Sequence, residues 1–235
     1  AGAARVALDE AEPLANAAGE SGVRASIAAL RAFIANTADG DLDAAVALHR
    51  QALALWEEAG DAVAANSGRY NLAVCALRGG RPDEVLARLA EAEAEAERQH
   101  DWRLLSQALN VEGEAHMQRG ATAEAVRAYR ASLELSWTLL AHTSFAHALW
   151  NLPFALVRRV DAAAAARLGG AAERFWAARI GAFAPEDEKD LARLRRRAAA
   201  QVGREAVERL WREGASLSLP RLVESALGHA PVAPS

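Results

Sequence analysis

The sequence is poor in three residue types that many functions need. Its 235 residues include one cysteine (Cys75), one methionine (Met117) and one lysine (Lys189). A single cysteine excludes an intrachain disulfide framework and favours a reducing compartment, so we expect a cytoplasmic protein. A phosphate-binding loop of the form G-x-x-x-x-G-K-[ST] does not occur. Because residue 1 is alanine, we expect the chain to be a piece of a longer protein.

Other absences exclude further classes of function. No stretch approaches the roughly 18 apolar residues of a membrane span, and the N-terminus lacks the pattern of a signal peptide. The formal net charge is -4, from 27 basic and 31 acidic side chains, which gives no reason to expect nucleic acid or a membrane as partner. Aromatic residues make up only 6% of the chain and the apolar content of 52% is largely alanine. This composition favours closely packed helices over sheets.

A period of 40 residues organises the chain. Gly40, Gly80 and Gly120 lie 40 residues apart, each between two stretches with the apolar spacing of an amphipathic helix. The first helix of each repeat is predicted at 23–38, 62–78 and 102–118, and the second opens near Leu42, Pro82 and Thr122. We expect Asp61 and Asp101 to cap the helices that follow them.

A fourth, degraded repeat is predicted from helices near 142–158 and 161–179. Val160 stands where the glycine of the turn is expected, and the pair Gly169-Gly170 is expected to weaken or break the second helix. Pro153 is expected to kink the first helix, which would end the regular array or shape a pocket. Residues 3–18 have the pattern of one further helix, which we interpret as half of a repeat.

The segment Tyr70-Asn71-Leu72-Ala73, followed by Gly80 and Asp83-Glu84-Val85-Leu86, resembles the tetratricopeptide repeat. Small residues also occupy the matching positions of the next repeat, among them Gly113 and Ser132, whereas Phe33 departs from the pattern. The resemblance implies an all-α fold, a right-handed superhelix of antiparallel helix pairs. The predicted boundaries are a half repeat at 1–20, repeats at about 21–60, 61–100 and 101–140, and a degraded repeat at 141–183.

The period is lost after residue 183. We predict a helical cap over 184–228, opened by Pro185, with Gly214 as a helix stop and Ser218 as the cap of the last helix, and a tail at 229–235. The order Val202-Gly203, Trp211, Gly214, Leu217-Ser218 resembles the end of the repeat domain in large bacterial signal-transducing NTPase regulators of the LuxR/MalT-like and SARP types and in multidomain cyclases. The resemblance implies a sensor or interaction domain of a transcriptional or signal-transduction regulator.

No constellation for catalysis, metal binding or a cofactor is found. The six histidines lack paired metal-ligand spacing, so isolated surface or groove histidines are expected. Cys75 is expected to be a buried, unreactive thiol. The acidic run 91–97 and the basic run Arg195-Arg196-Arg197 are interpreted as solvated helix faces.

In tetratricopeptide proteins the first helices line a concave groove, so the resemblance also implies a binding surface. The groove-facing positions are Ser67, Tyr70, Asn71 and Val74 in one repeat, Gln107, Asn110, Glu114 and Met117 in the next, and His147, Trp150 and Asn151 in the fourth. The predicted ligand is a peptide or protein segment or a small-molecule effector, and other domains of the full-length protein or a second copy are further expected partners. A freestanding adaptor that binds a protein segment is the alternative. Each groove residue can equally well bond only a neighbouring helix.

Overall fold

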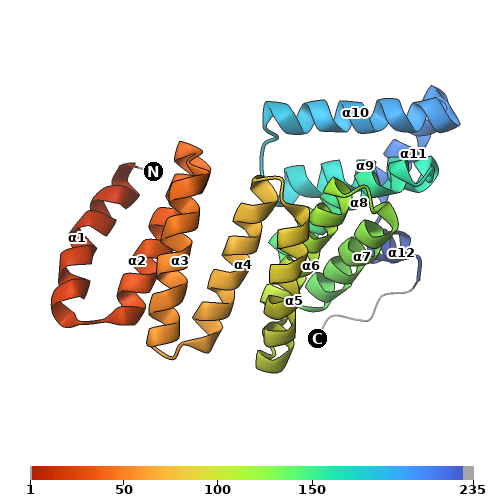
Figure 1. Ribbon diagram of the computed structural model, residues 1–235. Coiled ribbons are helices and arrows are strands. Elements are labelled where there is room, and N and C mark those ends of the chain that lie inside the picture. Colours follow the sequence, from red (N-terminus) through yellow and green to blue (C-terminus); the bar gives the residue numbers. More distant parts are fainter. Residues whose placement is uncertain (1, 230–235) are drawn as a thin grey trace. The chain divides into compact units, whose positions relative to one another are not determined.

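The computed structural model describes residues 2–229, and this part of the chain is all-α, as predicted (Figure 1). It divides into two compact units between Leu104 and Leu105, which we call the N-unit and the C-unit. Neighbouring helices pack against each other in sequence order within each unit, as in a helical repeat solenoid. The helices are α1 (Gly2–Ala18), α2 (Ser21–Ile34), α3 (Leu42–Glu58), α4 (Ala62–Arg78), α5 (Pro82–Gln99), α6 (Trp102–Gln118), α7 (Thr122–Thr138), α8 (His142–Arg158), α9 (Ala162–Arg179), α10 (Pro185–Val202), α11 (Arg204–Ser216) and α12 (Leu219–Leu227).

The turns between helices repeat every 20 residues. A residue with left-handed backbone closes each turn, at positions 40, 60, 80, 100, 120, 140 and 160. Glycine fills four of these positions, but His100, Leu140 and Val160 have φ angles of 55°, 53° and 63°. At Val160 the left-handed turn is therefore kept without glycine, at the cost of steric strain between the side chain and the backbone.

Aspartate caps follow several of these turns. The side chain of Asp61 accepts a hydrogen bond from the backbone nitrogen of Ala64 at 3.0 Å, and Asp101 accepts one from that of Leu104 at 2.9 Å. Both predicted caps are confirmed. Each satisfies one of the backbone donors that a helix leaves unpaired in its first turn.

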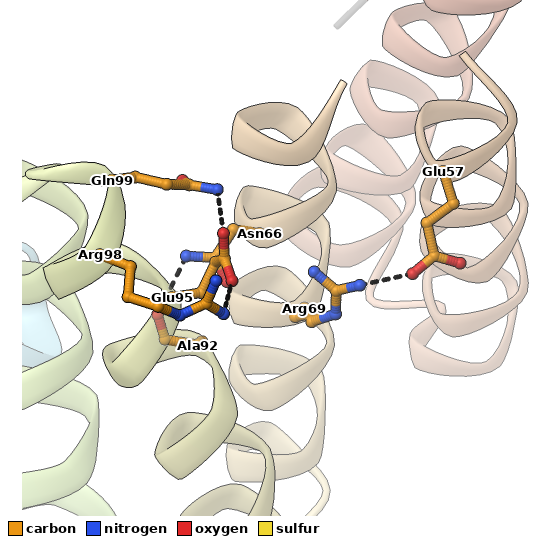
Figure 2. Close-up of polar contacts among 7 residues, drawn as sticks. All are labelled: Glu57, Asn66, Arg69, Ala92, Glu95, Arg98 and Gln99. Carbon is orange, nitrogen blue, oxygen red and sulfur yellow. Dashed lines mark hydrogen bonds and ion pairs between the residues drawn. The ribbon is translucent and has the colours of Figure 1, made fainter. Parts of the chain in front are cut away.

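Buried polar contacts join the two helices of a pair at equivalent positions. In the N-unit, the Nδ2 atom of Asn66 on α4 donates to the carbonyl oxygen of Ala92 on α5 at 2.9 Å (Figure 2). In the C-unit, the hydroxyl of Ser132 on α7 donates to the carbonyl oxygen of Ser106 on α6 at 2.6 Å. Positions 66 and 106, like positions 92 and 132, differ by one period of 40. Both repeats therefore have a hydrogen bond at these two positions. The donor lies on the first helix of the pair in the N-unit and on the second helix in the C-unit.

Ion pairs and hydrogen bonds form between neighbouring side chains at the surface of the N-unit. Arg69 of α4 pairs with Glu57 of α3, and Glu95 of α5 contacts both Arg98 and Gln99 on its own helix (Figure 2). The side chain of Glu95 is only 18% exposed. The acidic run 91–97 was predicted to be a solvated face, and for Glu95 that prediction is wrong because Arg98 and Gln99 cover its carboxylate.

The N-terminal helix pair departs from regular geometry at its end. Helix α2 continues into a π-helical turn, η1 (Ala35–Asp39), before Gly40 reverses the chain. Such turns insert one extra residue into the helical ladder and occur often near functional sites. Helix α1 packs on α2 through Leu8, Ala15 and Ile27. Whether α1 is half of a longer repeat stays a prediction.

The glycine pair of α9 does not break the helix, contrary to prediction. A side-chain carbon at Gly170 would lie 2.0 Å from the carbonyl oxygen of Trp211, and one at Gly169 would lie 2.6 Å from the Trp211 ring. On the facing helix, a side-chain carbon at Gly214 would lie 1.7 Å from the carbonyl oxygen of Arg167. These glycines therefore let α9 and α11 cross with their backbones in contact.

The same contact explains why Gly214 is no helix stop. Helix α11 continues past Gly214 to Ser216 before Ser218 precedes α12. Helix α10 begins at Pro185 as predicted, and Asp187 accepts a hydrogen bond from the backbone nitrogen of Ala184 at 2.9 Å. Residues 230–235 of the predicted tail lie outside the described residues.

Candidate ligand-binding site

The C-unit contains a cavity of about 650 Å³ between α6, α7, α8 and α10, which we call the C-cavity. Its volume lies in the range of pockets for small organic ligands. Charged, polar and aromatic side chains all contribute to its walls. The lining residues are Glu114, Met117, Gln118, Tyr129, Trp150, Asn151, Phe154, Arg158, Asp190, Arg193 and Arg197.

A carboxylate held by two amides forms the polar side of the C-cavity. The Oε1 atom of Glu114 accepts hydrogen bonds from Asn110 at 3.2 Å and from Asn151 at 3.3 Å. The same Asn151 amide lies 3.4 Å from the Oδ1 atom of Asn110. Burial raises the pKa of the Glu114 carboxyl, and the two amide donors oppose that rise. A cationic group on a ligand would offset the cost of burying this charge.

Tyr129 of α7 lies beside this carboxylate and is only 2% exposed. Burial, together with the charge of Glu114, raises the pKa of its phenol, so Tyr129 is a neutral hydrogen-bonding group at physiological pH. Its ring rests against Gly113, where a side-chain carbon would lie 2.4 Å from the ring. The small residue predicted at position 113 is what makes room for Tyr129.

Aromatic side chains of α8 form a second side of the C-cavity. The rings of Trp150 and Phe154 have centroids 6.2 Å apart, and Trp150 also contacts Trp176 at 5.1 Å and Phe183 at 5.7 Å. This cluster fixes the plane of the Trp150 ring. A flat, electron-rich ring beside a carboxylate is a suitable surface for a ligand cation.

Helix α10 brings cations to the rim. Arg193 pairs with Asp190 at 3.0 Å, and Arg197 lies one turn further along the same helix. From α8, Arg158 donates to the carbonyl oxygen of Met117 at 3.3 Å. The C-cavity therefore has the part-buried carboxylate of Glu114 on one side and, on another, arginines of which Arg193 is paired with Asp190.

Four predicted groove residues of the C-unit are brought together in this cavity: Glu114, Met117, Trp150 and Asn151. Asn110 joins them through its hydrogen bond to Glu114. Gln107 is half-buried and lies outside the lining. His147 also lies outside it and stacks on Trp176 with ring centroids 5.5 Å apart. Burial of the ring lowers the pKa of the His147 imidazole.

Sequence reasoning missed the residues that come from other helices. Tyr129 lies on a second helix of a pair, and Asp190, Arg193 and Arg197 lie on α10, outside the repeat. The basic run at 195–197 was interpreted as a solvated face, but Arg195 pairs with Glu173 at 2.9 Å and stacks 4.2 Å above the Trp211 ring. The regular spacing of the repeats carries no signal for where α10 packs.

The N-unit contains a second cavity, of about 450 Å³, between α2, α3 and α4, which we call the N-cavity. Three predicted groove residues line it: Tyr70, Asn71 and Val74. The fourth, Ser67, lies outside its lining, and its hydroxyl is 3.4 Å from the carbonyl oxygen of Val63. The lining residues are Ala29, Leu30, Phe33, Asn36, Thr37, His49, Tyr70, Asn71, Val74 and Arg78.

The two cavities occupy equivalent places in the repeat. Lining residues of one correspond to lining residues of the other at a separation of 80, which is two periods of 40. The pairs are Thr37 and Met117, His49 and Tyr129, Tyr70 and Trp150, Asn71 and Asn151, Val74 and Phe154, and Arg78 and Arg158. The equivalent arginines even share a role, because Arg78 donates to the carbonyl oxygen of Asn36 at 3.0 Å as Arg158 does to Met117.

The burial of His49 and Cys75 bears on the predictions for the histidines and for the single thiol. His49 is 5% exposed, so it is no surface histidine, and burial lowers the pKa of its imidazole. Cys75 is buried as predicted, and burial raises the pKa of its thiol. Within residues 2–229, no group of three or more histidine, cysteine or acidic side chains is placed to hold a metal ion.

Comparison with known proteins adds no assignment: neither a scan against protein-family models nor a search of curated proteins finds a match for this chain. In the described part of the chain, none of the helices combines the length and the apolar character needed to cross a bilayer.

Proposed function

We propose that this chain is a non-catalytic binding module whose C-cavity takes a small ligand with both a cationic and an anionic group. The observation that carries the proposal is that one cavity of about 650 Å³ is lined by the part-buried Glu114 carboxylate and also by Arg193 and Arg197. A ligand cation would lie between Glu114 and the Trp150 ring. Its anion would face Arg197 of α10, because Arg193 is already paired with Asp190.

The arrangement favours binding over chemistry. One oxygen of Glu114 accepts hydrogen bonds from two amides, and burial keeps Tyr129 neutral, so both groups are arranged to form hydrogen bonds with a ligand. Rigid amides and a fixed aromatic ring suit recognition, because little conformational entropy is lost when the ligand binds. We propose no cofactor for the module.

In a cell, we propose that the module serves as the sensor or interaction domain of a bacterial regulator in the cytoplasm. Support comes from the resemblance of the Tyr70-Asn71-Leu72-Ala73 segment and of the C-terminal order around Trp211 and Gly214 to the repeat domains of such proteins. Ligand binding between the repeats and α10 would then change how the cap region contacts other domains or a second copy.

The test is isothermal titration of the full chain with the common L-amino acids and a set of dipeptides, each of which carries both charges. Glu114→Gln and Arg197→Ala should each weaken the best ligand about tenfold, because each removes one charge partner. Matched controls are Glu112→Gln on α6 and Arg196→Ala on α10, since neither residue lines the C-cavity.

Two results would contradict the proposal. One is the absence of saturable binding for every member of the panel. The other is an Arg196→Ala variant that weakens binding as much as Arg197→Ala does. Binding of longer protein segments alone, with no response to the small zwitterions, would favour the adaptor alternative.

A further inference from the structure

The N-cavity has a chemistry that the proposed function does not use. Its walls are mainly apolar, and two of its side chains, Leu30 and Phe33, are 54% and 61% exposed. Both lie on α2, close to the π-helical turn η1. Large apolar side chains that border a cavity and remain open to water are typical of a ligand entrance.

One residue that lines this cavity has a buried polar atom without a partner. The Nδ1 atom of His49 is fully buried and makes no hydrogen bond within the described residues. His49 itself is 5% exposed and lines the N-cavity. An unpaired buried nitrogen is costly, and such groups in native proteins normally have a partner that the protein alone does not supply.

The one charged side chain that lines the N-cavity, Arg78, already has hydrogen-bond partners. The guanidinium of Arg78 donates to both the carbonyl oxygen and the Oδ1 atom of Asn36, at 3.0 Å and 2.9 Å. No acidic side chain lines the cavity. An anion would compete with these two hydrogen bonds, and a cation would find no counter-charge.

We propose that the N-cavity is a second binding site, for an uncharged and mainly apolar small molecule that carries a hydroxyl group bonded to Nδ1 of His49. The imidazole is neutral near pH 7, so Nδ1 is either a donor or an acceptor, depending on the tautomer. A hydroxyl both donates and accepts, and therefore serves either tautomer. The apolar body of the molecule would cover Leu30 and Phe33.

This site is independent of the proposed function, because none of its residues belongs to the C-cavity. It is also distinct in charge: the positions 80 residues before Glu114, which lines the C-cavity, and before its hydrogen-bond partner Asn110 hold the apolar residues Ile34 and Leu30. A zwitterion suited to the C-cavity would find neither of its charge partners in the N-cavity.

The experiment is a titration of the 15N-labelled 235-residue chain with phenol, cyclohexanol and 2-naphthol, observed through the histidine ring nitrogens. Naphthalene, which lacks the hydroxyl, and 2-naphthoate, which carries a charge, are the matched ligands for 2-naphthol. We expect saturable shifts of the His49 nitrogens with 2-naphthol and about tenfold weaker binding of naphthalene, the effect of one buried hydrogen bond. The other five histidines act as internal controls.

Variants separate the hydrogen bond from the apolar contact. His49→Phe should bring 2-naphthol and naphthalene to similar affinities, whereas His142→Phe, at an exposed histidine, should leave their ratio unchanged. Leu30→Lys, on the exposed rim, should weaken both ligands and is the variant to use if His49→Phe does not fold. The proposal is overturned if none of the three hydroxyl probes shifts His49, or if 2-naphthoate binds more tightly than 2-naphthol.

Discussion

The N-cavity and the C-cavity lie at equivalent positions of the repeat, yet they differ in volume and in the charge of their lining residues. Six lining positions correspond at a separation of 80, and an arginine hydrogen-bonded to the preceding helix pair closes each site. The N-cavity has mainly apolar walls, with His49 and no acidic side chain. The C-cavity has Glu114, Tyr129 and the arginines of α10 instead. A repeat can thus keep one architecture for a pocket and change its ligand class through a few side chains.

Much of the difference between the two cavities follows from the side-chain sizes at two equivalent positions. In the C-unit, Gly113 leaves room for the ring of Tyr129 to lie flat and buried. In the N-unit, the corresponding pair is Phe33 and His49, and Phe33 points into solvent with 61% of its surface exposed. The large side chain of Phe33 thus occurs with the smaller ring of His49, whereas Gly113 occurs with the larger ring of Tyr129.

The largest effect is expected where α9 crosses α11, because this crossing anchors the helices that enclose the C-cavity. Gly170→Ala would place a side-chain carbon 2.0 Å from the Trp211 carbonyl oxygen and force the two helices apart. We expect a loss of about 3 kcal/mol in the free energy of unfolding of the C-unit. Hydrogen exchange of the full chain should show faster exchange in α9 and α11 with no change in the N-unit.

The control for this variant is Gly22→Ala on α2, where no atom lies within 4 Å of the added carbon. It should stabilise the N-unit by about 0.5 kcal/mol through helix propensity. Equal protection of α9 in the Gly170→Ala variant and the parent chain would contradict the crossing.

The next largest effect is expected at the equivalent positions 113 and 33, where the two units have side chains of different size. Gly113→Ala should destabilise the C-unit by about 2 kcal/mol, because Tyr129 must move from its packed position. Phe33→Ala, at the equivalent position, should change the stability of the N-unit by less than about 0.5 kcal/mol, since its ring is exposed. Site-resolved hydrogen exchange measures both, and a similar cost for the two variants would break the comparison.

The two cavities should also respond to pH in opposite directions. Burial lowers the pKa of His49 in the folded state, so its contribution to stability is present above its ordinary value of 6.5 and is lost as pH falls. Burial raises the pKa of Glu114, so its contribution is present below its ordinary value of 4.5 and is lost as pH rises. Glu114→Gln should therefore stabilise the C-unit near neutral pH.

Hydrogen exchange at several pH values tests these signs. The stabilisation by Glu114→Gln should shrink as the solution is acidified, and His49→Phe should remove part of the acid sensitivity of the N-unit. A Glu114→Gln variant that is less stable than the parent chain near neutral pH would show that the carboxylate is satisfied by its surroundings.

The smallest effect is expected at the turns, where the two units differ as well. At its left-handed turn positions the N-unit has three glycines, at 40, 60 and 80, and His100, whereas the C-unit has one glycine, Gly120, together with Leu140 and Val160. Val160→Gly should stabilise the C-unit by about 0.5 kcal/mol, because relief of strain outweighs the entropy that glycine adds to the unfolded chain. Val160 is 77% exposed, so little packing is lost. Thermal unfolding of the variant and of Gly60→Ala, expected to be destabilised, measures the effect.

The helices could be predicted from the sequence because their signals are local. The spacing of apolar residues predicted α4 and α6 to the residue, and the aspartates predicted the caps at Asp61 and Asp101. Gly169, Gly170 and Gly214 were misinterpreted because a glycine that breaks a helix and one that allows two helices to touch have the same sequence signature. Only the partner helix distinguishes them.

The cavities could be predicted only in part, for a related reason. Transfer of the repeat positions found Glu114, Trp150 and Asn151, which lie on first helices. It missed His49 and Tyr129, which lie on second helices. It also missed the arginines of α10, a helix outside the repeat that packs on α8, α9 and α11. Long-range packing of that kind leaves no periodic pattern in the sequence.

The most direct test of the account is one titration that addresses both cavities in the same molecule. The side-chain amides of Asn110 and Asn151 report on the C-cavity, and the ring nitrogens of His49 report on the N-cavity. The account predicts that the tightest zwitterion of the amino-acid and dipeptide panel shifts the two amides and leaves His49 unchanged, while 2-naphthol does the reverse. Shifts at both cavities with either ligand, or at neither with both ligands, would contradict the claim that one repeat position has been given two different ligand chemistries.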